Sequence, residues 1–116
     1  MSAHGVGLFE NPLAADIRLE FDAALKNGAS VYVAAENILQ KHAHSIHDPD
    51  CSPIILYALA ALQLQHGVIS SKIRKRALTL INSGDGLERW RGASPEIYEA
   101  RKEVEQELRA RLVAMG

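Results

Sequence analysis

The stretch Ser52-Pro-Ile-Ile-Leu-Tyr-Ala-Leu-Ala-Ala-Leu-Gln-Leu64 decides the fold class of this chain. Its serine–proline start is typical of a helix N-cap followed by a proline in the first turn, and Gly67 marks the end of the helix. A helix that is apolar on nearly every side is usually the most buried one of its domain. The apolar residues 54–64 are too few to span a membrane, which takes about 20. We therefore predict a central, buried helix.

Similar start and stop signals flank this stretch on both sides. Asn11-Pro12 and Ser94-Pro95 repeat the cap-plus-proline start, while Ser30 and either Ser70 or Ser71 supply further caps. Asn27-Gly28 and Gly84-Asp-Gly86 read as helix stops, the second of them followed by a short turn over residues 87–90. Apolar residues recur at helical spacing between these signals. The stretch Val31-Tyr-Val33 is the only β-like one, and it is short and close to a cap.

The last predicted helix, which follows Ser94-Pro95, has a mixed pattern. We expect its inward face to carry Ile97, Val104, Leu108, Leu112 and Met115. On its other faces we expect three ion pairs at a spacing of four residues, namely Arg101–Glu105, Glu105–Arg109 and Glu107–Arg111.

Together these signals predict an all-α fold, a compact single-domain bundle of about five antiparallel helices over residues 1–116. The composition agrees, because 47% hydrophobic and 23% charged residues are typical of a globular domain. The single cysteine, Cys51, cannot form an internal disulfide, which favours a reducing compartment. We see neither a membrane segment nor a secretory signal, so the expected location is cytoplasmic and no membrane partner is expected.

Charge is distributed unevenly along the chain. The net charge is −1, with an acidic excess in residues 1–69 and a basic excess in residues 70–116. Such a dipole can steer a charged partner, but it falls short of the basic footprint of a dedicated nucleic-acid binder. Nucleic acid is therefore disfavoured as a partner.

Two clusters could in principle carry chemistry. The first cluster lies within residues 42–51 and contains the ligand types that zinc prefers. Its spacing is poor and no second cluster completes it, so a polar connector is the favoured interpretation. Its histidines could still make partner binding sensitive to pH. A Cys51–His47 nucleophile lacks a glycine-rich elbow, and no phosphate-binding loop is present. We therefore expect no enzyme, no catalytic residues, no metal and no cofactor; the members of the first cluster are His42, His44, His47, Asp48, Asp50 and Cys51.

Residues 62–78 suggest a helix-turn-helix, in which a basic second helix over residues 71–78 would enter the major groove of DNA. Its cations would contact phosphates. The other interpretation is an ordinary helical hairpin with a solvated basic face, which the acidic first half of the chain favours. The four cations are Lys72, Arg74, Lys75 and Arg76.

The amino-terminal stretch Gly5-Val-Gly-Leu-Phe-Glu-Asn-Pro-Leu-Ala-Ala-Asp16 has two interpretations. As structure, Phe9 covers the helix start as a hydrophobic staple ahead of the Asn11 cap, and Glu10 and Asp16 place negative charge near the positive end of the helix. As function, Glu10, Asp16 and Glu20 belong to a recognition surface.

This stretch resembles the start of the DUF4259 family of small bacterial proteins, through Gly5, Gly7, Phe9, Glu10, Asn11, Ala14 and Asp16. The sequence departs from that pattern at His4, where the family has Trp, and at Pro12, where it has Asp. The lost Asp weakens any role of a paired carboxylate in the motif. The family has no established catalytic role, and small helical proteins of this general type are often immunity partners of toxins, including those of contact-dependent and type VI secretion systems. The resemblance thus implies a toxin-immunity protein.

The leading hypothesis is a non-catalytic, cytoplasmic binding protein, an immunity protein that occludes the active site of a cognate bacterial toxin. An acidic patch would suit a toxin with a basic cleft, and exposed aromatic side chains would act as anchors. The alternatives are a DNA-binding regulator that uses residues 71–78 and a structural homo-oligomer. Candidate anchors are Tyr32, Tyr57, Trp90 and Tyr98; the predicted partner-binding residues are Glu10, Asp16, Glu20, Asp22, Glu36 and Trp90.

Overall fold

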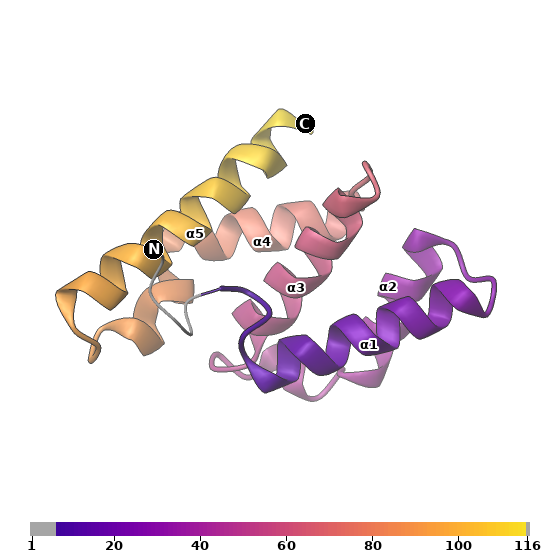
Figure 1. The fold of residues 1–116 in the computed structure, drawn as a ribbon, viewed down its shortest axis with the longest axis horizontal. Helices are drawn as coiled ribbons and strands as arrows, with labels where there is room; N and C mark the ends of the chain where they lie inside the picture. Colours follow the sequence, from indigo (N-terminus) through magenta and orange to yellow (C-terminus); the bar gives the residue numbers. More distant parts are fainter. Residues whose placement is uncertain (1–6, 116) are drawn as a thin grey trace.

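The computed structural model describes residues 7–115, which form α-helices and short 3-10 helices and contain no strand (Figure 1). The all-α bundle predicted from the sequence is confirmed. In chain order the elements are α1 (Pro12–Lys26), α2 (Val31–Lys41), η1 (Ser45–His47), α3 (Ser52–Gln65), α4 (Ser71–Ser83), η2 (Asp85–Trp90) and α5 (Pro95–Ala114).

Helix α3 lies in the middle of the bundle, as its apolar sequence predicts. Eleven of its 14 residues are buried. Helices α1 and α2 pack on one side of it and α4 and α5 on the other, so α3 contributes to both halves of the core (Figure 1). The 3-10 helix η2 packs against both α4 and α5. Within residues 7–115, every helix falls short of the length and apolar character needed to cross a bilayer.

Most of the predicted helix caps are present. The side chain of Asn11 accepts from the backbone N–H of Leu13 at 2.8 Å, and that of Ser30 accepts from Val33 at 3.1 Å. Ser94 caps α5 in the same way. Each of these oxygens satisfies an N–H that the helix itself leaves unpaired.

Two predicted caps are replaced by other contacts. Ser52 is the first residue of α3 rather than its cap, because the N–H groups of Cys51 and Ser52 both donate to the carbonyl of Asp48, at 3.0 and 2.8 Å. Ser70 precedes α4, but its hydroxyl accepts from the buried Gln63 at 2.8 Å. The side chain of Gln63 therefore ties the end of α3 to the start of α4.

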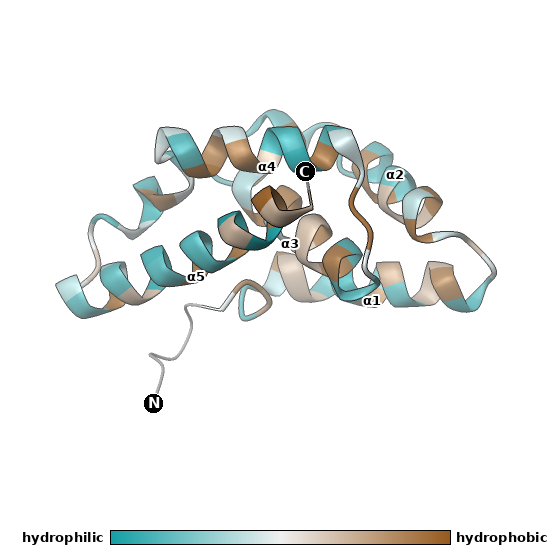
Figure 2. Ribbon diagram, turned by 90° about the horizontal axis from the view of Figure 1, so that it is seen from above, coloured by the Kyte–Doolittle hydropathy of each residue, from teal (hydrophilic) through white to brown (hydrophobic). Residues whose placement is uncertain are grey.

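The prediction for the inward face of α5 is wrong in two places. Arg101 and Glu105 are buried, whereas Met115 is 43% exposed. Helical spacing explains the pair, because residues 101 and 105 lie on the same face as Leu108 and Leu112. Arg109 donates to Asn82 at 2.8 Å instead of pairing with Glu105. Figure 2 shows how hydrophilic α5 is along its length.

Candidate functional site

A buried polar network joins α3 to α5. Tyr57 is 0% exposed, Glu105 1% and Arg101 6%. The Nε of Arg101 donates to Oε2 of Glu105 at 3.1 Å, and the hydroxyl of Tyr57 donates to Oε1 of the same carboxylate at 3.3 Å. Burying a charged pair is tolerated only where such partners replace the lost water.

Burial is the largest cause of the pKa shift of each group in this network. Burial raises the pKa of Glu105, while the Arg101 guanidinium and the hydrogen bonds to the carboxylate act in the opposite direction. Burial, together with the charge of Glu105, raises the pKa of Tyr57, so its hydroxyl keeps the proton that it donates. Burial lowers the pKa of Arg101, and Glu105 opposes that shift.

The network also positions η2, through Gly86. A Cβ added at this glycine would overlap the Tyr57 hydroxyl and lie 2.8 Å from Oε1 of Glu105. Only a residue without a side chain allows η2 to approach α3 and α5 so closely. The sequence interpretation used Gly86 as a helix stop and missed this contact.

Trp90, at the end of η2, is half-buried between two arginines. The guanidinium carbon of Arg101 lies 5.2 Å from the centroid of the indole ring and that of Arg89 lies 6.0 Å from it. Both distances are within the range of cation–π attraction. The indole Nε1 is buried and has no hydrogen-bond partner within residues 7–115.

A hollow of about 190 Å³ lies beside Trp90, and we call it the Trp90 hollow. The amino-terminal segment forms one wall, while α3, η2 and α5 form the others. It brings together Glu10 and Trp90, two predicted partner-binding residues that are distant in sequence. Its lining residues are Gly7, Leu8, Glu10, Asn11, Pro12, Ile54, Tyr57, Arg89, Trp90 and Arg101.

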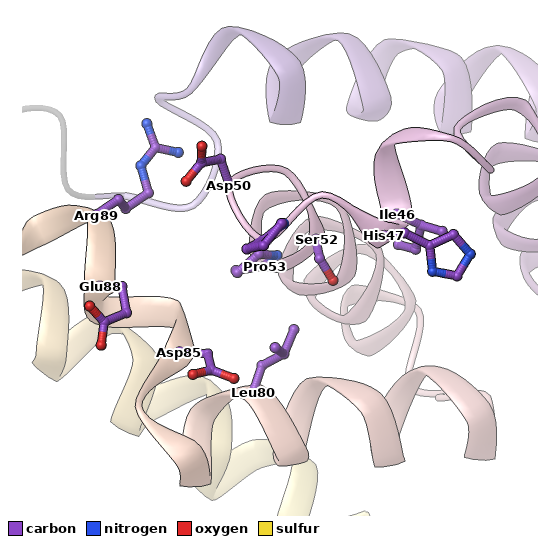
Figure 3. Close-up of a pocket in the computed structure, with 10 residues that line it drawn as sticks. Ile46, His47, Asp50, Ser52, Pro53, Leu80, Asp85, Glu88 and Arg89 are labelled. Atoms are coloured by element: carbon purple, nitrogen blue, oxygen red, sulfur yellow. The ribbon is translucent and has the colours of Figure 1, made fainter.

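A second hollow of about 330 Å³ lies on the other side of Arg89, and we call it the acidic hollow (Figure 3). Its apolar lining comes from Ile46, Pro49, Pro53 and Leu80. In Figure 3, Asp85 and Glu88 lie along one side of the opening and Asp50 lies near Arg89, with His47 at the far end. Arg89 lines both hollows, so the two are neighbours at η2, and the acidic hollow also carries Asp50, Asp85 and Glu88.

The other predicted partner-binding residues lie on α1 and α2. Glu20 accepts from Lys41 and lies 3.1 Å from Nε2 of His42, and Glu36 pairs with Lys72 at 3.6 Å. Both carboxylates are thus already engaged with cations or potential cations of the same chain. Asp16 and Asp22 are exposed on α1.

The predicted aromatic anchors differ in exposure. Tyr57 is fully buried in the polar network, so the expectation that it is a surface anchor is wrong. Tyr32 is 51% exposed on α2. Tyr98 and Trp90 are both half-buried.

The histidine-rich connector of residues 42–51 gives little support for a metal site or for a nucleophilic cysteine. Among residues 7–115, no three His, Cys, Asp or Glu side chains are grouped closely enough to hold a metal ion. Burial and the neighbouring Asp48 and Asp50 raise the pKa of Cys51. An activated nucleophilic cysteine has the opposite shift.

Two of the four cations of the helix-turn-helix candidate already have partners within this chain. Arg74 donates to the backbone carbonyl of Leu112 at 2.8 Å, which ties α4 to the end of α5. Lys72 pairs with Glu36. Lys75 and Arg76 remain as candidates for phosphate contacts.

The amino-terminal motif has a clear local role in the residues that the structure describes. Glu10 accepts from the backbone N–H of Gly7 at 2.8 Å, which closes a tight turn ahead of the Asn11 cap. Phe9 packs against the core, with the guanidinium carbon of Arg18 5.0 Å from its ring centroid. His4 and Gly5, which also enter the family resemblance, lie outside the described residues.

Sequence reasoning missed Arg101 and Glu105 as part of the site. A signal was available, because both residues interrupt the apolar stripe of α5 at its own spacing. Arg89 offered no such signal, since its place between the two hollows depends on how η2 packs. No family model matches this sequence, and neither a curated protein nor a solved structure does.

Proposed function

We propose that this chain is a non-catalytic binding protein whose partner contacts the surface around η2. The observation that carries the proposal is Trp90, a half-buried indole between two arginines at the edge of a hollow that Glu10 also lines. Tryptophan and arginine are enriched among the residues that dominate binding energy. The same hollow joins the amino-terminal motif to the aromatic candidate that the sequence favoured.

The support beneath Trp90 favours this role. Gly86 packs against Tyr57 and Glu105, and Arg101 stacks on the indole ring. A side chain held in this way loses little conformational freedom when a partner binds. Preorganisation of this kind suits a protein that acts by forming a tight complex.

For the partner we propose a bacterial toxin domain, which this chain would neutralise by covering its active site. The resemblance of the amino-terminal motif supports this choice. Obstruction requires a stable surface and no reactive group, which agrees with the raised pKa of Cys51. The carboxylates of the acidic hollow, Asp50, Asp85 and Glu88, would complement cationic side chains of a toxin.

The test begins with the neighbouring gene, which the proposal expects to encode a toxin domain. That domain is then co-expressed with this chain, and the readouts are cell survival, co-purification and calorimetric titration. Trp90→Ala should weaken the complex by about 30-fold or more, as expected for a central hot spot. Tyr32→Ala is the matched control, because this exposed aromatic lies on α2 and lines neither hollow. If both variants lose affinity equally while their helix content is unchanged, the interface does not lie at η2. No complex with the toxin would refute the immunity role.

A homo-oligomer is the second candidate, because several large apolar side chains are exposed. Leu19 is 70% exposed on α1, and Val113 and Met115 are 48% and 43% exposed at the end of α5. Association through such residues would bury apolar area. Sedimentation at several concentrations tests this candidate, and a monomer at every concentration would exclude it.

DNA binding stays as the third candidate, carried by Lys75 and Arg76. Titration with duplex DNA at two salt concentrations tests it, because phosphate contacts make affinity fall steeply with salt. Affinity that is absent, or that does not respond to salt, would remove this candidate.

A further inference from the structure

A groove of about 570 Å³ lies along α4, and we call it the α4–α5 groove. Its lining residues on α4 recur every three or four positions from the start of the helix to its end, so one face of α4 forms a wall of the groove. The loop before α4 and the residue after α5 contribute to the rest of the lining. The lining positions on which the argument depends are Ile69, Ser71, Lys75, Leu78, Asn82 and Met115.

The lining of the α4–α5 groove is apolar and cationic. Ile69 and Leu78 are half-buried and Met115 is 43% exposed, so each offers apolar surface to a partner. Arg74 and Lys75 add positive charge, and within residues 7–115 no acidic side chain lines the groove. Arg74 is already bound to a backbone carbonyl of α5, whereas Lys75 is exposed and forms no ion pair in the described part of the chain. Such a groove suits a helix that carries an apolar side chain flanked by carboxylates.

Helix α1 of this chain presents a surface of that kind. Leu19 is 70% exposed, and Asp16 and Asp22 lie three residues to either side of it, on the same face of the helix. Both aspartates are exposed, and neither forms an ion pair within residues 7–115. Lys26 lies at the far end of the same stripe, so the part around Leu19 is acidic. With 15 and 13 residues, α1 and α4 are also similar in length.

We propose that α1 of a second copy of this chain docks in the α4–α5 groove, with Leu19 against the apolar lining and Asp16 and Asp22 near Lys75. The charge complementarity between the two surfaces identifies the occupant. The proposal rests on the homo-oligomer candidate described above, to which it assigns the two contact surfaces. It leaves the surface proposed for the toxin free, because the groove shares no lining residue with the Trp90 hollow or the acidic hollow.

The role of α1 is tested by Leu19→Lys, with self-association measured by sedimentation equilibrium at several protein concentrations. This variant removes the apolar side chain and brings a cation toward Lys75, so the association should weaken by about tenfold or more. Val33→Lys is the matched control, because Val33 is 50% exposed on α2. Both positions are exposed, and unchanged helix content verifies the fold. Equal losses for the two variants would overturn α1 as the docking helix.

The role of the groove is tested by Lys75→Glu in the same experiment. A glutamate at this position repels the two aspartates of α1, so the association should weaken by about fivefold or more. Lys102→Glu is the matched control, because it makes the same change of charge at an exposed position of α5 that does not line the groove. Equal losses for these two variants would show a general effect of net charge and refute docking in the groove.

A mixing experiment tests whether the two surfaces meet each other. The double variant Asp16→Lys, Asp22→Lys should self-associate weakly, because its α1 is repelled by the cationic groove. When it is mixed with Lys75→Glu, the acidic α1 of the second variant can dock in the unchanged groove of the first. The mixture should therefore associate more tightly than either variant does alone. A mixture that associates no better than its components would overturn the proposal.

The outcomes separate this contact from the functions proposed above. An oligomer that neither Leu19→Lys nor Lys75→Glu weakens would refute this contact and leave the homo-oligomer candidate standing. A wild-type chain that is monomeric at every concentration would refute both of them. In either case the toxin complex is tested independently, through Trp90→Ala.

Discussion

Replacing Glu105 by leucine should destabilise the protein severely. Arg101 is 6% exposed and its guanidinium lies 3.1 Å from the Glu105 carboxylate. Removing one partner of a buried ion pair costs about 3–5 kcal/mol. The Tyr57 hydroxyl also loses its acceptor, which adds about 1 kcal/mol. Because the total stability of a domain is about 5–15 kcal/mol, Glu105→Leu should lose a large share of it.

The double variant Arg101→Met, Glu105→Leu separates the pair from its packing. Replacing both members by apolar residues of similar volume is often neutral or stabilising. We therefore expect the double variant to be more stable than Glu105→Leu by about 2 kcal/mol or more. Glu103→Leu is the surface control on the same helix and should change stability by no more than about 0.5 kcal/mol.

The assay is urea unfolding, followed by Trp90 fluorescence and by helix content, with the slope m compared between variants. Coincidence of the two probes establishes two-state behaviour. The reasoning fails if Glu105→Leu costs less than about 1 kcal/mol, which would mean that the pair is solvated. It also fails if the losses in unfolding free energy of Glu105→Leu and of the single variant Arg101→Met add up to the loss of the double variant. Additive losses would mean that the two side chains do not interact.

Three further predictions test the neighbourhood of the site. Gly86→Ala should cost about 1–3 kcal/mol in urea unfolding, because its Cβ overlaps Tyr57, whereas Gly92→Ala, which meets open space, should be nearly neutral. Cys51 should react with iodoacetamide at pH 8 more slowly than a cysteine peptide does, because burial and nearby carboxylates raise its pKa; a faster rate would contradict this. Burial raises the pKa of Glu20, but hydrogen bonds from Lys41 and His42 outweigh it and hold the pKa below 4.5. The stabilisation by Glu20 should therefore be complete above pH 4.5 and disappear as the pH falls below it, and Glu20→Gln should lack this dependence in unfolding measured from pH 2 to 7.

Helix positions could be predicted from the sequence because the interactions that set them are local. The Asn11 and Ser30 side chains bond N–H groups two and three residues away, and a continuous apolar run places α3 in the core whatever surrounds it. At Ser70 the local rule placed the N-cap correctly, but the hydroxyl accepts from Gln63 of α3 instead of capping α4.

The candidate site could be predicted only in part. Glu10 and Trp90 were identified as separate candidates, and their meeting at one hollow depends on how η2 packs against α3 and α5. The sequence suggests that the carboxylates of Glu20 and Glu36 are available to a partner protein. In the structure each forms an ion pair with a lysine of another helix.

What only the tertiary structure decided is the role of Arg101 and Glu105. Four residues apart on a helix, such a pair is as consistent with a solvated surface as with a core. The choice depends on Tyr57, 48 residues away from Glu105, which supplies the buried donor. It depends also on Gly86, whose missing side chain lets η2 close over the pair. Periodicity places a residue on a face of its helix, but burial is decided by what other segments bring to that face.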